Sequence, residues 1–323
     1  MEAVQSEKRS PKKAVPATRL GRAVQKLRRD LIKYRYIYLM LLPVLAYYIV
    51  FCYIPIYGIQ IAFKNFSPGL GIGESPWTGL THFRAFFAGP YFVRTFTNTL
   101  LISLYSILFS FPSSILLALL LNEVGNRYFK KTVQTISYLP HFISTVVICG
   151  IIREFTASNG LIGGIVKALG GVPKTLLIDP AMFRPIYIIS EIWQGIGWGS
   201  IIYLAALSGI DPTLYDAAVV DGAGRFRRMV HITLPGILPT IVIMFILRLG
   251  SIMGVGWEKI ILLYNENIYS TADVISSYVY RKGLIEQNYS YSAAVGLFNS
   301  VINFMLVVFA NSFSRRMSGT SLW

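Results

Sequence analysis

The twenty residues from Asp216 to Pro235 read DAAVVDGAGRFRRMVHITLP and lie between two strongly apolar segments. Directly upstream, Asp211 and Pro212 form a helix-start signal, because aspartate caps helices well and a proline at the first helical position needs no N–H partner. Gly222 and Gly224 offer the left-handed stop. The stretch therefore predicts a short helix at a membrane surface, between two segments that enter the bilayer.

This short helix has one face suited to contact with another protein. Four residues share that face by helical spacing: Leu214, Ala217, Ala218 and Asp221. The two alanines keep the face flat, so a partner can approach closely. A basic run follows, made of Arg225, Arg227 and Arg228. We interpret the stretch as a docking helix.

The spacing of the stretch resembles a motif of the permease subunits of type I ABC importers, E-A-A, three residues, G, nine residues and I-x-L-P. The matching residues here are Asp216, Ala217, Ala218, Gly222, Ile232, Leu234 and Pro235. Asp216 stands where the motif has glutamate, which keeps the charge but shortens the side chain. The flanking sequence resembles the carbohydrate-uptake branch, and within it the LplB-type permeases for oligosaccharides derived from polysaccharides.

This resemblance covers most of residues 35 to 323 and implies a set of partners. The motif residues, with Asp221 and Ala223, would form the surface that couples the chain to two cytoplasmic ABC ATPase subunits. ATP and Mg²⁺ would bind to those subunits, and no cofactor would bind to this chain. A second permease subunit in a heterodimer, an extracytoplasmic solute-binding protein and a carbohydrate substrate are also implied. The expected location is the bacterial cytoplasmic membrane.

The composition independently indicates a membrane protein. Of the 323 residues, 54% are hydrophobic and only 14% are charged, so much of the apolar surface must face lipid. The net charge of +15 does not indicate a nucleic-acid partner, because the basic residues are segregated between membrane segments. Cys52 and Cys149 both lie in apolar segments without metal-ligand spacing, which argues against a disulfide or zinc framework.

Six apolar segments are each long enough to cross the hydrocarbon layer as a helix. They span residues 36–62, 95–121, 132–152, 183–207, 232–253 and 291–313. The predicted fold class is an all-α integral membrane protein with six transmembrane helices and the type I ABC importer permease fold. The predicted parts are a basic tail (1–35), the first helix (36–62), a core with five helices (95–313), a coupling loop (208–235) and a C-terminal tail (314–323).

The distribution of basic residues predicts the orientation. The tail, the loop near Arg127, the docking loop and the C-terminal end together hold 19 of the 30 lysines and arginines. Basic residues are retained on the cytoplasmic side of a membrane. Both termini and the docking helix are therefore expected in the cytoplasm, where an ATPase would be.

No catalytic motif is found in the sequence. It contains no phosphate-binding loop, no H-E-x-x-H and no G-x-S-x-G. His82, His141 and His231 stand alone, and a lone histidine more often fills a packing role than a catalytic one. We therefore expect a permease that hydrolyses no ATP itself, with no metal site.

A polar stripe within the fourth segment is the candidate substrate pathway. Tyr187, Glu191, Gln194 and Trp198 recur at helical spacing and so line one face, and Arg248 lies in the fifth segment. Aromatic rings beside hydrogen-bonding groups suit a sugar. The alternative is that Glu191 pairs with a neighbouring helix and the aromatic residues pack or anchor. Serines along the second segment, Ser106 among them, favour helix packing.

Two other functional classes remain open. A secondary transporter or channel would also be polytopic, but it typically has an inverted repeat with broken helices and needs no docking helix. A membrane-embedded enzyme is disfavoured by the absence of a paired catalytic set.

Overall fold

The computed structural model describes residues 29–30 and 32–318. Most of the predicted basic tail, 1–35, and the end of the predicted C-terminal tail, 314–323, lie outside the described residues. The chain divides into two compact units, Met1–Ile59 and Gln60–Trp323. Throughout the described residues the structure is helical, with one isolated bridge between Lys64 and Trp77 and no strand.

The first unit is built on helix α2 (Arg35–Tyr48), which continues through a π turn, Ile49–Tyr53, into a 3₁₀ segment, Ile54–Phe63. No residue of α2 is buried, and its exposed side chains are mostly large and apolar. The continuous helical stretch Arg35–Phe63 is long and apolar enough to cross a membrane. It corresponds to the predicted first span, 36–62.

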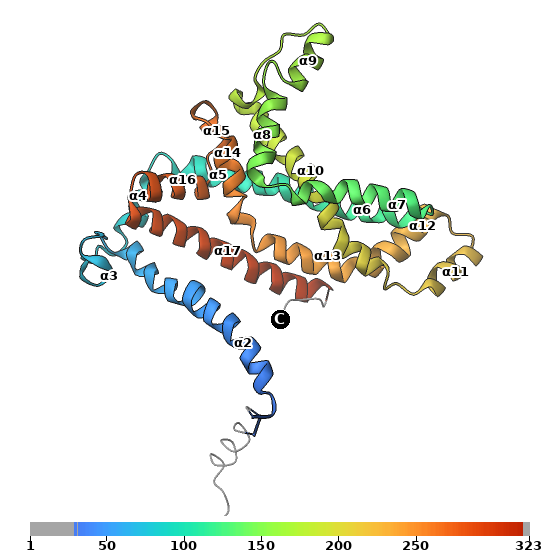
Figure 1. Cartoon of the computed structure of the whole chain (residues 1–323), viewed down its shortest axis with the longest axis horizontal. Coiled ribbons are helices and arrows are strands. Elements are labelled where there is room, and N and C mark those ends of the chain that lie inside the picture. Colours follow the sequence, from blue (N-terminus) through green and yellow to red (C-terminus); the bar gives the residue numbers. More distant parts are fainter. Residues whose placement is uncertain (1–28, 31, 319–323) are drawn as a thin grey trace, which may run out of the picture. The chain divides into compact units, whose positions relative to one another are not determined.

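The second unit contains the remaining helices. They are α3 (Gly71–Glu74), α4 (Thr81–Ala88), α5 (Phe92–Tyr105), α6 (Phe111–Glu123), α7 (Arg127–Tyr138), α8 (Thr145–Thr156), α9 (Leu161–Ala168), α10 (Pro180–Leu207), α11 (Pro212–Val220), α12 (Arg225–Arg228), α13 (Leu234–Leu249), α14 (Trp257–Leu263), α15 (Tyr269–Ala272), α16 (Ile275–Tyr280) and α17 (Tyr289–Ser318). Helix α17 packs along α13, and α10 packs against α6, α7 and α13. In Figure 1, α11 lies at one end of this bundle, and α4 and α16 lie at the other.

Two π turns keep long helices continuous across prolines. The turn Ser106–Ser110 joins α5 to α6 just before Pro112, and the turn Met229–Thr233 joins α12 to α13 just before Pro235. A proline cannot bond the carbonyl four residues earlier and clashes with it. In both places that carbonyl belongs to the π turn, whose wider ladder accommodates the missing bond.

Five helical stretches among the described residues are long and apolar enough to span a membrane. They are Arg35–Phe63, Phe92–Glu123, Thr145–Ala168, Arg225–Leu249 and Tyr289–Arg316. The 28-residue α10, predicted as the fourth span, is long enough to cross but is not in this set. Its polar side chains face other helices or a cavity, and such a helix need not be apolar all round.

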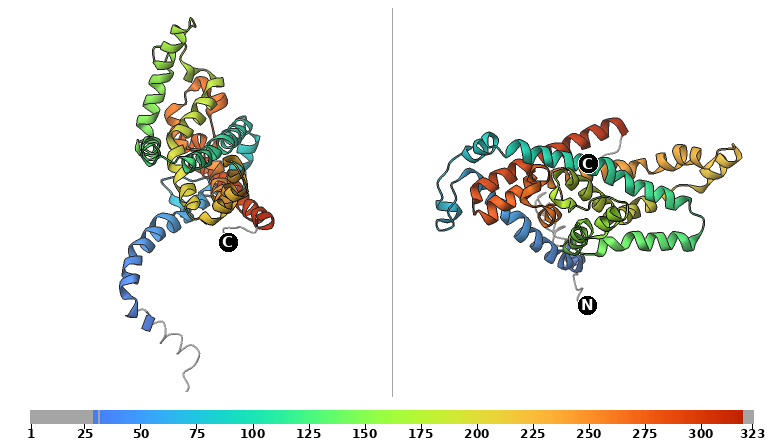
Figure 2. Two further views of the ribbon diagram at one scale, coloured as in Figure 1. Left: turned by 90° about the vertical axis from the view of Figure 1, so that its right-hand side faces the viewer. Right: turned by 90° about the horizontal axis from the view of Figure 1, so that it is seen from above.

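The predicted third span, 132–152, is wrong as a single helix. Helix α7 ends at Tyr138, a short 3₁₀ turn covers Leu139–Phe142, and α8 begins at Thr145. Pro140 has no N–H to continue the helical ladder, and Ile143 is extended at ψ 135°. The Ser144 hydroxyl then caps α8 by accepting from Val147 N at 3.4 Å. In Figures 1 and 2, α8 turns away from α7 and projects with α9 from the bundle.

Helix α10 packs closely against α6 and α7 because glycines lie at the contacts. A Cβ on Gly197 would lie 2.1 Å from Ser137 O in α7, and one on Gly199 would lie 2.5 Å from Ser114 Oγ in α6. Only residues without a side chain allow this approach. These contacts hold α10 at the centre of the second unit.

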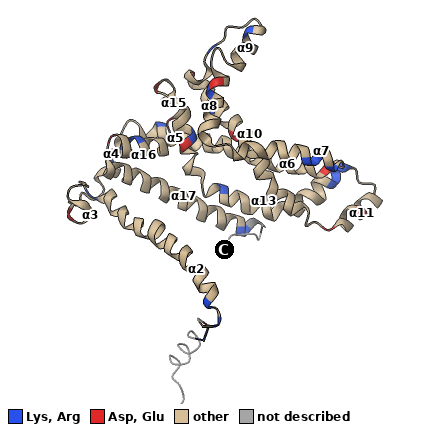
Figure 3. Cartoon of the chain, in the orientation of Figure 1, with Lys and Arg blue, Asp and Glu red and all other residues tan. Residues whose placement is uncertain are grey.

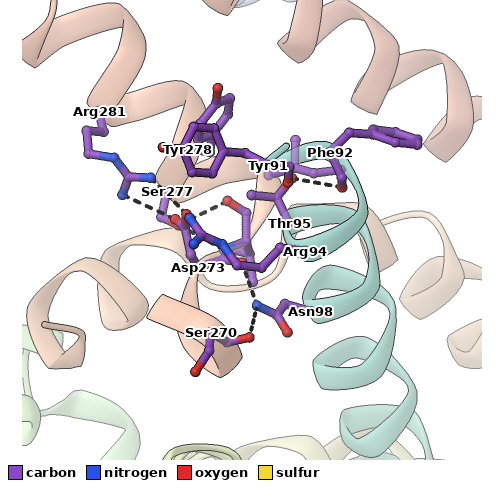
Figure 4. A network of polar contacts seen from close by, with 12 residues as sticks. Tyr91, Phe92, Arg94, Thr95, Asn98, Ser270, Asp273, Ser277, Tyr278 and Arg281 are labelled. Atoms are coloured by element: carbon purple, nitrogen blue, oxygen red, sulfur yellow. Dashed lines mark hydrogen bonds and ion pairs between the residues drawn. The ribbon is translucent and has the colours of Figure 1, made fainter. Parts of the chain in front are cut away.

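A buried carboxylate fixes the end of the bundle away from α11. Asp273 is fully buried between α15 and α16, and it accepts from Arg94 Nη2 at 2.9 Å and Arg281 Nη2 at 2.8 Å (Figure 4). Ser277 Oγ also donates to Asp273, at 2.9 Å. Arg94 lies in α5, so the network joins α5 to the α15–α16 segment.

Charged residues are sparse along the long helices. In Figure 3 most of the ribbon of α6, α13 and α17 carries neither colour of charge, whereas basic residues gather at the end that holds α7 and α12. This segregation matches a bundle whose middle lies in lipid.

Candidate functional site

A polar cavity of about 420 Å³ lies in the second unit, where α10, α13 and α14 meet the π turn between α5 and α6. Its lining includes Tyr187, Glu191, Gln194, Arg248, Ser103, Ser106, Thr145 and, from 251–259, every residue except Met253. Ligand pockets in proteins typically have volumes of this order. Four of the five predicted pathway residues are thus brought together.

The centre of the cavity is a three-residue network that joins three helical segments. Arg248, in the last turn of α13, forms an ion pair with Glu191 near the middle of α10 and also donates to Ser106 Oγ. Ser106 Oγ lies 2.8 Å from both carboxylate oxygens of Glu191. Each charge is partnered, which offsets the large cost of holding it away from water. We call Ser106, Glu191 and Arg248 the cavity triad.

The wall beside the triad carries a second cation that the sequence did not single out. Lys259 in α14 is only 6% exposed. Its Nζ donates a hydrogen bond to Gln194 Oε1 at 3.3 Å. The ammonium also lies 5.6 Å from the centre of the Tyr187 ring. Burial lowers the pKa of Lys259 below its ordinary value of 10.5, and the nearby Cys149 and Glu191 act in the opposite direction.

The segment leading into α14 brings further groups to the cavity. Gly254, Val255 and Gly256 line it where the chain passes from a short 3₁₀ turn into α14, and the half-exposed Trp257 follows directly. Sequence reasoning assigned no site role to Ser106, Trp257, Glu258 or Lys259. The one available signal was GVGWEK, in which two glycines permit a tight turn before polar and aromatic residues.

Trp198, the fifth predicted pathway residue, does not line this cavity. Its ring stacks on His141, with ring centres 4.4 Å apart and planes at 4°, and it also contacts Phe142. His141 lies in the turn after α7. The stripe along α10 therefore divides: its first three residues face the cavity, and its last residue packs on the α7–α8 turn.

The predicted docking helix is α11, and its ends form as the sequence indicated. Asp211 Oδ1 accepts from Thr213 N at 2.9 Å, and this hydrogen bond lowers the pKa of Asp211. At the other end, Gly222 has φ +72°, and Ala223 N donates to Ala218 O at 2.8 Å. The Gly222 end is a left-handed helix stop of the Schellman type. The prediction of a left-handed Gly224 is wrong: its φ is −66°, and it precedes α12 in an extended conformation.

No residue of α11 is buried. The predicted contact residues Asp216, Ala217, Asp221 and Gly222 are exposed, and Ala218 and Ala223 are half-buried. Large apolar side chains also face outward here: Leu214, Val219, Val220 and Phe226, with Val220 at 87% exposure. A helix with this much exposed apolar surface is typical of a protein contact.

The rest of the motif begins the next long helix. Ile232 lies in the π turn Met229–Thr233, and Leu234 and Pro235 open α13. The Tyr215 hydroxyl in α11 lies 3.0 Å from Thr233 Oγ1, which is buried. The motif thus joins α11 to a helix that runs without interruption to Arg248, in the cavity triad.

Comparison with known proteins identifies relatives of the whole chain. A family model described as the binding-protein-dependent transport system inner membrane component matches residues 83–319. The chain is 42% identical over 316 residues to protein LplB of Bacillus subtilis (strain 168), covering 97% of this chain and 98% of that protein. It is also 42% identical to the polygalacturonan/rhamnogalacturonan transport system permease protein YteP of the same organism, covering 91% of this chain and 92% of that protein.

A similar fold has been solved in a crystal structure. One chain of a bacterial ABC transporter involved in the import of the acidic polysaccharide alginate matches with a TM-score of 0.85 and 44% identity. The match covers 91% of this chain and 99% of that chain. A second structure contains a similar chain in a complex with an alginate pentasaccharide-bound periplasmic protein, again with a TM-score of 0.85.

Proposed function

The chain belongs to the family of binding-protein-dependent transport system inner membrane components, and from this we propose that it imports an oligosaccharide released from a polysaccharide. In this proposal it is one permease subunit, works by alternating access and relies on ATP hydrolysed by partner subunits. Membership of this family makes it a transport permease and not a catalyst. The observation that carries the proposal is the cavity triad, a charged network at mid-helix joined by one helix to an exposed docking surface.

The cavity suits a sugar because it combines hydrogen-bonding groups with an aromatic ring. Glu191, Gln194, Arg248 and Lys259 supply donors and acceptors, and the exposed Trp257 ring offers a face on which a pyranose can stack. The relatives support this substrate class, since YteP is described as a polygalacturonan/rhamnogalacturonan permease and the solved transporter as an alginate importer. A second permease subunit would complete the pathway.

The connection from α11 to the triad gives the mechanism. Movement of a partner ATPase against α11 would be passed through the Tyr215–Thr233 contact to the helix Arg225–Leu249, whose last turn carries Arg248. The ion pair between Arg248 and Glu191 links that helix to α10. Rigid-body movement of one helix relative to the other would open or close the cavity.

Transport by the purified assembly tests this function. The permease pair, the ATPases and the binding protein are reconstituted in proteoliposomes, and uptake of labelled oligosaccharides is measured with ATP, with ADP, and with a sodium or proton gradient but no nucleotide. We expect uptake with ATP alone, and only when the binding protein is present. Uptake driven by a gradient without nucleotide would instead support a secondary transporter.

The docking role of α11 needs its own test. Ala217→Arg is expected to abolish substrate-stimulated ATP hydrolysis and uptake together, because a long charged side chain would hold two packed surfaces apart. Ala217→Ser, which adds only one small polar atom at the same position, is the matched control and should be much milder. Full stimulation in Ala217→Arg would show that this face is not the coupling surface.

The same proposal places both termini and α11 in the cytoplasm. In sealed cells lacking the native cysteines, single cysteines near Arg127 and Gly224 should resist a membrane-impermeant thiol reagent. Cysteines near Gly73 and Asn267 should react with it. Labelling at Gly224 from outside would reverse the orientation.

A further inference from the structure

Lys259 is the most unusual charged group in the cavity. Its side chain is 6% exposed, yet it lines a cavity that also contains the triad. A buried ammonium is costly unless an anion accompanies it. Within residues 29–30 and 32–318, Lys259 forms no ion pair with a carboxylate, whereas Arg94, Arg248, Arg281 and Lys282 all do.

The nearby carboxylates do not neutralise Lys259. Glu191 is engaged by Arg248 and Ser106. Glu258 is the adjacent residue, and consecutive residues on a helix point in different directions. Its carboxylate makes no ion pair with Lys259. Lys259 therefore has no carboxylate in ion-pair contact on the cavity wall, and its burial is what lowers its pKa.

The partners of Lys259 hold it in place but leave it capacity to bind. An ammonium has three N–H donors, and Gln194 Oε1 accepts one of them. The Tyr187 ring lies on one side. The Cys149 thiol donates weakly to the Lys259 carbonyl oxygen, at 3.9 Å. A positioned cation with free donors beside the exposed Trp257 ring is suited to a sugar that carries a carboxylate.

We propose that Lys259 determines the substrate specificity of the cavity by binding a carboxylate of an acidic, uronate-containing oligosaccharide. This inference rests on the proposed import function and specifies its substrate class. The division of labour follows from the contacts: Arg248 is already neutralised by Glu191 and holds the helices together, while Lys259 is left for the substrate. A neutral oligosaccharide would leave the Lys259 charge unpaired in the loaded cavity.

The test compares matched substrates and matched variants in the reconstituted assembly. The probes are oligosaccharides of three to six units prepared from polygalacturonate or alginate, the same oligosaccharides after methyl esterification, and neutral malto- and cello-oligosaccharides. The variants are Lys259→Met, Lys259→Arg and Lys282→Gln. Lys282 is paired with Glu286 outside the cavity lining, so its variant controls for loss of one positive charge.

We expect the parental protein to import the acidic oligosaccharides and to discriminate against their esters. Lys259→Met should raise the KM for the acidic substrates about tenfold or more, as expected for loss of a charged hydrogen-bond partner, and leave the ester unaffected. Lys259→Arg should restore part of the affinity. Lys282→Gln should not weaken acidic substrate binding.

Thermal stability separates this role from a structural one. Removing an unpaired buried charge relieves a desolvation cost, so Lys259→Met should match or exceed the parental thermal midpoint while its KM for acidic substrates rises. Added acidic oligosaccharide should stabilise the parental complex more than the variant. If Lys259 is needed for folding, Lys259→Met should instead have a lowered thermal midpoint, and any change in KM would follow from misassembly. That result would overturn the inference.

Other outcomes are equally decisive. The parental assembly could import neutral oligosaccharides or esters as well as it imports acidic ones, or Lys259→Met could keep the parental KM for acidic oligosaccharides. Either result would show that Lys259 does not bind a substrate carboxylate, although the import function stands. If the parental assembly imports none of the probes with ATP while its ATPase is active, the proposed oligosaccharide import itself fails, and this inference fails with it.

Discussion

Tyr215 and Thr233 lie 18 residues apart in sequence, yet their hydroxyl oxygens are 3.0 Å apart. Tyr215 belongs to the exposed helix α11, and Thr233 is buried at the end of the π turn that precedes α13. This hydrogen bond is a side-chain connection between the docking surface and the membrane helix. A connection of this kind can transmit a displacement only if it stays formed during the movement.

The Tyr215 hydroxyl is therefore expected to matter for coupling. Tyr215→Phe and Thr233→Val each remove one partner, and each should lower uptake per ATP hydrolysed about two- to fivefold, since a single hydrogen bond contributes about 1 kcal/mol. The double variant should be little worse than either single one, because the two act through one contact. Additive losses would show that the residues act separately.

Gly222 should tolerate only residues that accept a left-handed backbone. A Cβ at this position would meet nothing within 4 Å, but φ is +72°. Gly222→Val should therefore disrupt the end of α11 by backbone strain and lower stimulated ATP hydrolysis. Gly222→Asn, which adopts this conformation at lower cost, should keep most of it. Equal loss in both variants would point to a steric contact with a partner in place of strain.

Glu191 and Trp198 should behave differently, although they share a helix. Glu191→Gln leaves Arg248 without its counter-ion, so uptake should fall at least about tenfold and the complex should lose stability. Exchanging Arg248 for Met in the same chain should recover stability but not uptake. Trp198→Ala should instead loosen the α7–α10 contact and reduce assembly, with near-parental uptake per assembled complex. Parental uptake by Glu191→Gln would remove the triad from the pathway.

Asp273→Asn should destabilise the end of the second unit away from α11. Arg94 and Arg281 would both lose their buried counter-ion, and loss of one partner from a buried pair costs about 3 to 5 kcal/mol. Because Arg94 is partly exposed, we expect the lower end of that range. Glu286→Gln, in the exposed pair with Lys282, is the matched control and should cost under about 1 kcal/mol. The thermal midpoints of the purified complexes measure both.

The sequence by itself determined the membrane class, the helical fold and the ends of α11. Long apolar runs, an aspartate before proline and a glycine at the stop are local signals, and their physical effects act within one or two turns of chain. The same locality explains the one wrong span. Pro140 and Ser144 break the segment 132–152, but the run of apolar residues around them outweighed these signals.

Only the tertiary structure decided which polar residues meet. Glu191 and Gln194 were predicted from the helical spacing of α10, but spacing cannot show that Arg248 neutralises Glu191 or that Trp198 stacks on His141. Lys259 lies in a segment that reads as an ordinary loop, and its lack of a carboxylate in ion-pair contact among the described residues becomes evident only once the neighbouring carboxylates are placed. Pairing between distant segments depends on how helices pack, because a charge is balanced by whatever lies within a few ångströms of it and not by its neighbours in sequence.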